Sequence, residues 1–150
     1  MDAYIYEFFE AARDDDVQRL KNLIAKGVDV NVADEDTGST ALHVASLKGR
    51  RQVIEYLVGR GANVNVQNLR GVTPLYYLGQ GHYTALAIFL ICNGARLDIK
   101  CQRGWTVLDV TPKHVHAELF SAVEKYQLQV QQKKAGAPSP LLGQTVKIST

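Results

Sequence analysis

Long apolar runs are absent from this sequence of 150 residues, and no stretch approaches the roughly 18 to 20 apolar residues that span a bilayer. The chain opens with Met1-Asp2-Ala3-Tyr4, without the basic segment and apolar stretch of a secretory signal. Only two cysteines are present, Cys92 and Cys101, which favours reduced thiols over a disulfide framework. We therefore expect a protein of the cytoplasm, with the nucleus as an alternative.

A strong charge of one sign is also missing. The 17 basic and 15 acidic residues leave a formal charge of +2, which is too small to indicate nucleic acid or an anionic membrane as a partner. The composition is 46% hydrophobic and 21% charged, which is ordinary for a soluble domain with a continuous core. Disorder along the whole chain is thereby excluded.

Signatures of catalysis and of metal binding are lacking as well. The sequence has no glycine-rich phosphate loop, no ordered Ser/His/Asp set and no paired carboxylates in an apolar setting. A zinc set can be written from Cys92, Cys101, His114 and His116, but no Cys-x-x-Cys pair brings the ligands together. We expect no enzyme, no cofactor and no metal.

Three consecutive aspartates, Asp14-Asp15-Asp16, allow two interpretations. Calcium loops need a defined ligand spacing and a glycine, which this run does not have. The run directly precedes a predicted helix, and carboxylates at a helix N-terminus are favoured by the helix dipole. We favour the capping interpretation.

The sequence repeats itself at a fixed step. The segments 40–43, 73–76 and 106–109 each begin with Thr and carry Leu at the third place, and they start 73 − 40 = 33 and 106 − 73 = 33 residues apart. Gly27, Gly61 and Gly94 repeat with the same phase, at steps of 34 and 33. Periods of this length indicate a solenoid of stacked units.

Each unit is predicted to be a helix, a turn and a second helix. In the unit that starts at Thr73, the Thr hydroxyl can cap a helix, Pro74 suits its first position and Leu75 begins the buried stripe. A second apolar stripe ends at Ile91, before a left-handed stop at Gly94. Such short helices are marginal alone, so stacking must create the core.

The units at both ends depart from the pattern. Residues 4–26 supply two helices without a preceding hairpin, as an N-terminal cap would. Pro112 falls where the first helix of the last unit should continue and should cut it short, and a closing helix then runs from about Val115 to Tyr126. Gly79 and Gly81 predict that the helix beginning at Thr73 is short or mobile, because glycine costs roughly 0.5–1 kcal/mol against alanine in a helix.

The chain resembles the ankyrin-repeat family in its Thr-Pro-Leu-His pattern, its Gly-Ala-x-Val-Asn segment and its period. The match is strongest over 38–66, and Gly81-His82 lies one place before the family's Gly-His register. The resemblance implies an all-α ankyrin-repeat solenoid of about four helix-turn-helix units with β-hairpin loops and atypical capping units at both ends. The units are expected at 1–33, 34–66, 67–99 and 100–126, followed by a polar, Pro/Gly-containing tail or linker at 127–150.

The resemblance also implies a function, which is a non-catalytic module that binds a protein or peptide on its concave face. The chain would stand alone like small, myotrophin-like ankyrin proteins or form the N-terminal part of a larger scaffold or adaptor. One alternative is a regulator that sequesters or inhibits an enzyme or a transcription factor; a more distant one is a nucleic-acid binder. The candidate contact residues are Asp36, Lys48, Leu69, Arg70, Val72, Tyr77, Gln80, Lys100, Arg103, Trp105 and Lys113.

Charge along the expected hairpin tips is uneven. Asp36 marks the first tip, whereas Arg70, Lys100 and Arg103 mark the later ones, so an acidic part of the partner is expected in the C-terminal half of the groove. Trp105 beside Arg103 either anchors the partner or packs on the cap around Pro112.

Two further residue types have assigned family roles. His43 stands where the family's imidazole bridges backbone groups between units. Asn31 and Asn65 each follow a leucine by eight residues, which resembles the pattern modified by asparaginyl hydroxylases, while a hairpin-stabilising role is the favoured alternative. A mass increase of one oxygen on either asparagine would identify the modification.

Overall fold

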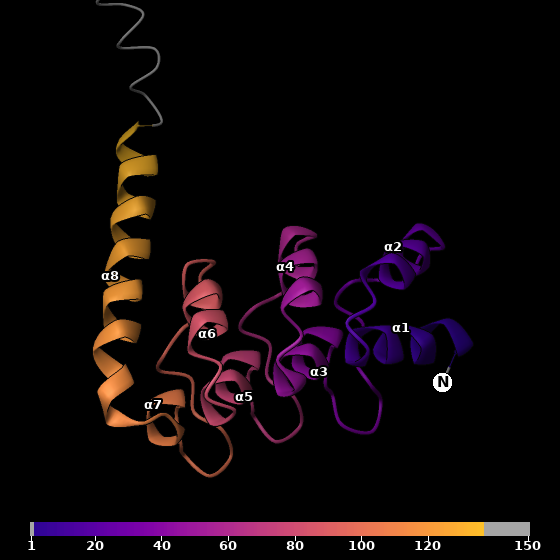
Figure 1. The fold of residues 1–150 in the computed structure, drawn as a ribbon, viewed down its shortest axis with the longest axis horizontal. Helices are drawn as coiled ribbons and strands as arrows, with labels where there is room; N and C mark the ends of the chain where they lie inside the picture. Colours follow the sequence, from indigo (N-terminus) through magenta and orange to yellow (C-terminus); the bar gives the residue numbers. More distant parts are fainter. Residues whose placement is uncertain (1, 137–150) are drawn as a thin grey trace, which may run out of the picture.

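A computed structural model describes residues 2–136, and these residues form eight helices (Figure 1). The helices are α1 (Ala3–Arg13), α2 (Val17–Ala25), α3 (Ala41–Lys48), α4 (Arg51–Gly59), α5 (Pro74–Gln80), α6 (Thr84–Ile91), α7 (Val107–Val110) and α8 (Lys113–Gly136). No helix in this part of the chain is both long and apolar enough to cross a bilayer.

The helices are arranged as a row of stacked pairs. The helices α1, α3, α5 and α7 lie along one side of the molecule, their partners α2, α4, α6 and α8 lie along the other, and the connecting loops project beyond the first row (Figure 1). Each first helix contacts the next one, α1 with α3, α3 with α5 and α5 with α7. This order confirms the all-α solenoid of helix pairs.

The repeated threonines start the first helices of the units, as predicted. The Thr40 hydroxyl accepts from the backbone N–H of His43, and the Thr73 hydroxyl accepts from that of Tyr76. At the start of α7 the bonds run the other way, since the N–H and the hydroxyl of Thr106 both donate to Asp109 Oδ2, at 2.7 and 3.3 Å. These caps satisfy N–H groups that short helices would otherwise leave unpaired.

One hydrophobic cluster runs through the whole stack. It begins with Phe8 and Phe9 on α1, continues through side chains such as Leu42, and ends with Leu119 and Ala122 on α8. No helix pair has a closed core of its own, because each contributes one layer to this cluster. The core is therefore shared between units, as a solenoid requires.

The loops between units are tight hairpins rather than β-ladders. Ala33 and Thr40 form an isolated antiparallel bridge, and the described residues contain no longer strand. Backbone bonds close the three tips, Asp34 N–H to Ser39 O at 2.8 Å, Asn68 N–H to Val72 O at 3.0 Å and Cys101 N–H to Trp105 O at 2.9 Å. We call these loops hairpin 1, hairpin 2 and hairpin 3.

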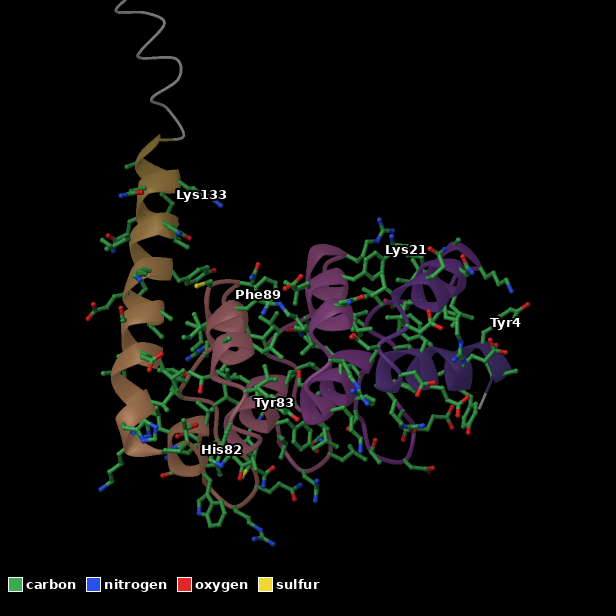
Figure 2. The ribbon with its side chains drawn as sticks, in the orientation of Figure 1. Tyr4, Lys21, His82, Tyr83, Phe89 and Lys133 are labelled. Atoms are coloured by element: carbon green, nitrogen blue, oxygen red, sulfur yellow. The ribbon has the colours of Figure 1, made fainter. Side chains whose placement is uncertain are left out.

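The first helix of the last unit, α7, has only 4 residues, which confirms the early end predicted from Pro112. The closing helix is longer than the predicted 115–126. It runs over 24 residues to Gly136, since the Gln- and Lys-rich segment from Gln127 onward contains no proline or glycine until that position. The added turns, which carry Lys133, project past α6 (Figures 1 and 2). The rest of the expected tail, 137–150, lies outside the described residues.

The first helices end with an equivalent left-handed residue in each of the first three units. Asp15, Gly49 and His82 have φ angles of 57°, 66° and 61°. In each case the next backbone N–H donates to the carbonyl five residues back, at 2.8–2.9 Å. His82, which lies at the end of α5 (Figure 2), therefore takes the place that glycine holds at 49, whereas Gly81 has a φ of −82°.

The helix α5 is one residue shorter than α3, with 7 residues against 8, and its mobility stays a prediction. Gly79 has a packing role that the sequence did not reveal. A Cβ built on Gly79 would lie 2.5 Å from Val107 Cγ2 and 2.7 Å from Thr111 Oγ1. The missing side chain lets α7 approach α5 closely.

The Gly79→Ala variant separates these two roles. Helix propensity alone would make it more stable by roughly 0.5–1 kcal/mol. Because the methyl group would meet α7, we expect instead a loss of about 1–3 kcal/mol, measured by urea denaturation. Gly59→Ala is the control, since a Cβ there meets nothing within 4 Å. A Gly79→Ala protein at least as stable as the parent would contradict the packing role.

Candidate binding surface

Neighbouring hairpin tips are joined by backbone hydrogen bonds. The N–H of Leu69 donates to Thr37 O at 2.9 Å, and the N–H of Gln102 donates to Arg70 O at 3.0 Å. The Gln102 side chain adds a bond to Leu69 O at 2.6 Å. The three tips therefore form one continuous edge whose parts hold each other in place.

Glycines permit this close approach. Gly38 has a φ of 69°, and a Cβ there would lie 3.0 Å from the backbone nitrogen of Leu69. Gly71 has a φ of 74°, and a Cβ there would lie 3.0 Å from the backbone nitrogen of Gln102. Both positions need a residue without a side chain, for the left-handed conformation and for the space.

Side chains also fix the shape of the first two hairpins. Asp34 Oδ1 accepts from the backbone N–H groups of Asp36 and Thr37 at 2.9 and 2.8 Å. Asn68 Oδ1 does the same for Arg70 and Val72, at 3.0 and 3.1 Å. The equivalent residue of hairpin 3 is Cys101, whose thiol is a weak acceptor, so this hairpin depends more on its bonds to hairpin 2.

His43 links the second unit to the third, as the family role of the residue predicts. Thr40 N–H donates to its Nδ1 at 3.1 Å, so Nε2 carries the proton and donates to Val72 O at 2.8 Å. Burial lowers the pKa of His43, and the hydrogen bonds to backbone groups of Val72 and Val66 offset this only in part. The imidazole is therefore neutral in the folded protein.

The surface made by the hairpins and the exposed sides of the first helices is the one that the family resemblance identifies as the concave face, and a cavity of about 720 Å³ lies on its N-terminal half. We call it the α1 pocket, because one of its walls is α1. The other walls are hairpin 1, α3, hairpin 2 and one residue of α5. Its lining residues are Tyr6, Phe9, Glu10, Arg13, Asp34, Asp36, Thr37, Ser39, Val44, Leu47, Asn68, Leu69, Arg70 and Tyr77.

A smaller cavity of about 280 Å³ lies beside hairpin 3, and we call it the Trp105 pocket. Trp105 is 46% exposed, so it is not buried beneath the closing helix, and the Arg103 guanidinium lies 5.8 Å from the centre of its ring. None of the lining residues is acidic; they are Arg70, Val72, Tyr76, Tyr77, Gln80, Cys101, Gln102, Arg103 and Trp105.

The two pockets share Arg70 and Tyr77. Arg70 Nη2 donates to the Tyr77 hydroxyl at 3.3 Å, and this bond raises the pKa of Arg70. The Tyr77 ring in turn packs edge-on against His43, with centroids 6.1 Å apart. Tyr77, which together with Arg70 separates the two pockets, therefore contacts His43, and the buried hydrogen bond from His43 to Val72 O joins the second unit to the third.

Most of the predicted contact residues are exposed on this face, but two are not. Val72 and Tyr77 are only 7% and 9% exposed and form a small cluster with Tyr76, because their side chains fill the space beneath hairpin 2. Of the exposed residues, Asp36 and Leu69 line the α1 pocket, and Gln80, Arg103 and Trp105 line the Trp105 pocket. Lys48, Lys100 and Lys113 are exposed but line neither pocket.

The residues that α1 contributes to this face were not among those predicted from the sequence. Arg13 lies 34 residues before Leu47, which lies 33 before Gln80, so the three occupy equivalent positions. Glu10 is related in the same way to Val44 and Tyr77. Extending the period into the first unit would have placed both residues on the concave face.

The three aspartates act as caps and as an ion-pair partner. Asp16 accepts from Arg19 N–H at the start of α2 at 3.0 Å, which confirms the capping interpretation for this residue. Asp15 caps α4 of the next unit through Val53 N–H at 3.0 Å, and Asp14 pairs with Arg19 at 3.5 Å. Within 2–136, no three His, Cys, Asp or Glu side chains gather as metal ligands would, so the two cysteines and two histidines do not converge.

Asn31 and Asn65 each bond to the backbone of the next unit, just after the second helix of that unit. Asn31 Oδ1 accepts from Asn63 N–H at 2.8 Å, and Asn65 Oδ1 accepts from Arg96 N–H at 2.9 Å. Asn65 also donates to Gly94 O at 3.0 Å. These bonds support the stabilising role, and the hydroxylation stays a prediction.

Comparison with known proteins gives one family. A family model described as "Ankyrin repeats (3 copies)" matches residues 8–101. The matched range covers the second part of α1, the helices α2 to α6 and the first two hairpins, including the whole α1 pocket apart from residue 6.

Curated relatives match over parts of their length. The chain is 33% identical over 112 residues to protein phosphatase 1 regulatory subunit 12A of Mus musculus, and 32% identical over 122 residues to probable E3 ubiquitin-protein ligase XBOS31 of Oryza sativa subsp. japonica. It is 36% identical over 66 residues to human ankyrin repeat domain-containing protein 40. The matches cover 75%, 79% and 44% of this chain but only 11%, 27% and 18% of the relatives.

The neutral state of His43 predicts how stability depends on pH. Its pKa is lowered from 6.5 by folding, so below about pH 6.5 the unfolded chain binds a proton that the folded protein resists. We expect the free energy of unfolding, measured by urea denaturation, to be lower at pH 5.5 than at pH 7.5. His43→Gln should be less stable at pH 7.5 and lose part of this dependence, whereas a variant of the exposed His114 keeps it. An unchanged pH dependence in His43→Gln would contradict the assignment.

Proposed function

The chain belongs to the ankyrin-repeat family, whose repeats are protein–protein interaction modules, and we propose that its concave face binds a protein or peptide partner without catalysis. The observation that carries this proposal is the hairpin edge. Three tips joined by hydrogen bonds present exposed Leu69 and Trp105 beside two cavities. A surface held in its bound shape loses little entropy on association.

The C-terminal half of this face is suited to an acidic segment. Arg70 and Arg103 line the Trp105 pocket, and no carboxylate lines it. Exposed tryptophan and arginine are the residue types that dominate binding energy at interfaces. We infer that Trp105 gives apolar contact while the two guanidinium groups pair with carboxylates of the partner.

A non-catalytic role is consistent with how the ionisable groups near the face are used. His43 is buried and bonded on both ring nitrogens, and Asp34 and Asn68 hold the backbone of their hairpins. These groups support the surface and are not positioned to transfer protons to a bound molecule.

A regulator that holds an enzyme is the second candidate function. It is favoured by the match to a phosphatase regulatory subunit, although that match covers only 11% of the relative. Nucleic acid fits less well, because Asp34 and Asp36 lie on the same concave face as the arginines and would repel phosphates.

The Trp105→Ala and Arg103→Glu variants test the proposed surface. In a pull-down from a cell extract with the intact chain, we expect proteins retained by the parent to be reduced at least tenfold, as loss of an anchor worth about 2 kcal/mol implies. The melting temperature should stay unchanged because Trp105 is exposed. Phe120→Ala, which removes an aromatic side chain 49% exposed on α8, is the control and should retain the same proteins. A Trp105→Ala protein that melts several degrees lower but keeps its partners would show packing instead.

A further inference from the structure

The α1 pocket differs in chemistry from the Trp105 pocket. Three large apolar side chains from three separate elements reach into solvent around it. They are Tyr6 on α1, Leu47 on α3 and Leu69 on hairpin 2, with exposed fractions of 56%, 50% and 61%. Phe9 and Val44 complete the apolar wall. A volume of about 720 Å³ is enough for more than one side chain of a bound peptide.

The open side of this pocket is acidic. Asp34 and Asp36 line it from hairpin 1, and no basic group of residues 2–136 lies within ion-pair distance of either carboxylate. The three hydrogen bonds to Asp34 all reach Oδ1, and no bond within residues 2–136 reaches its Oδ2. The two carboxylates can therefore pair with a basic group of a bound partner.

The other charged residues that line the α1 pocket are either in ion pairs or lie next to the Trp105 pocket. Glu10 lies 3.9 Å from both Arg13 and Arg19, so it adds little net charge. Arg70 bonds to Tyr77 on the partition with the Trp105 pocket. The concave face is thus acidic and apolar at hairpin 1 and basic and aromatic at hairpin 3.

The two pockets are held at a fixed separation. Leu69 of the α1 pocket and Gln102 of the Trp105 pocket are linked by the Gln102 side chain, and both tips are bonded to their neighbours. A ligand that enters both pockets must match this spacing and cannot exchange its ends without placing like charges together.

We propose that the concave face recognises one extended peptide of mixed charge. An apolar side chain next to a lysine or arginine enters the α1 pocket, and an acidic side chain further along the same peptide meets Arg103 and Arg70. This inference rests on the proposed function and adds the partner's chemistry. The peptide has one basic, apolar end and one acidic end, and it binds in a single orientation.

The test is selection of a displayed library of random dodecapeptides on the intact chain, with four variants in parallel. Asp36→Lys reverses the charge of the α1 pocket and Arg103→Glu that of the Trp105 pocket. Leu47→Ala removes an apolar wall, and Leu128→Ala, 56% exposed on α8, is its matched control. Peptides selected on the parent are synthesised, and their affinities are measured by fluorescence anisotropy.

Selected peptides are expected to carry a basic residue beside an apolar one at one end and acidic residues at the other. Asp36→Lys should bind them about five- to tenfold more weakly and regain affinity when the peptide's basic residue is changed to Glu. Arg103→Glu should respond only to a change at the acidic end. Leu47→Ala should weaken binding about fivefold and Leu128→Ala should not.

Two results overturn the inference in different ways. Acidic peptides that depend on Arg103 and are indifferent to Asp36→Lys and Leu47→Ala would leave the proposed function standing and remove the α1 pocket from recognition. No enrichment over an empty support, or selected peptides indifferent to Asp36→Lys, Leu47→Ala and Arg103→Glu alike, would overturn the proposed function together with the inference.

Discussion

Apolar burial between neighbouring helix pairs holds the other features of this structure in place. No pair encloses its own core, and the cluster that begins at Phe8 on α1 continues to Ala122 on α8. Short helices of 7 to 11 residues are marginal in water, so each depends on the layer before and after it. Polar bonds such as that from His43 to Val72 O then fix the register between the layers.

The binding surface follows from this stacking. Because consecutive pairs stand side by side, their hairpins reach the same edge, where Thr37, Leu69, Arg70 and Gln102 join them by backbone bonds. Along this bonded edge, acidic and apolar groups lie near hairpin 1 and basic groups lie near hairpin 3. In the recognition that we propose, this separation of charge along one face would give an extended partner a preferred direction.

The sequence predicted those parts of the fold that depend on local patterns. Threonine caps, the 33-residue period and the break at Pro112 are local signals, and the structure confirms each. The sequence did not predict that Val72 and Tyr77 are buried, that Gly79 lets α7 pack closely against α5, or that α1 forms a wall of a pocket. These features depend on how units approach each other. The end of α8 was missed for another reason, since helix-forming residues continue after the apolar stripe becomes sparse.

The most direct test of this account uses the single tryptophan as a local probe. Trp105 lies on hairpin 3, far along the stack from Phe8, which is fully buried in the first unit. Phe8→Ala should cost about 3–5 kcal/mol and shift the urea transition of Trp105 fluorescence by as much as that of the far-ultraviolet helix signal. A Trp105 transition that keeps its midpoint while helix content is lost earlier would show that the units fold independently and would contradict the shared core.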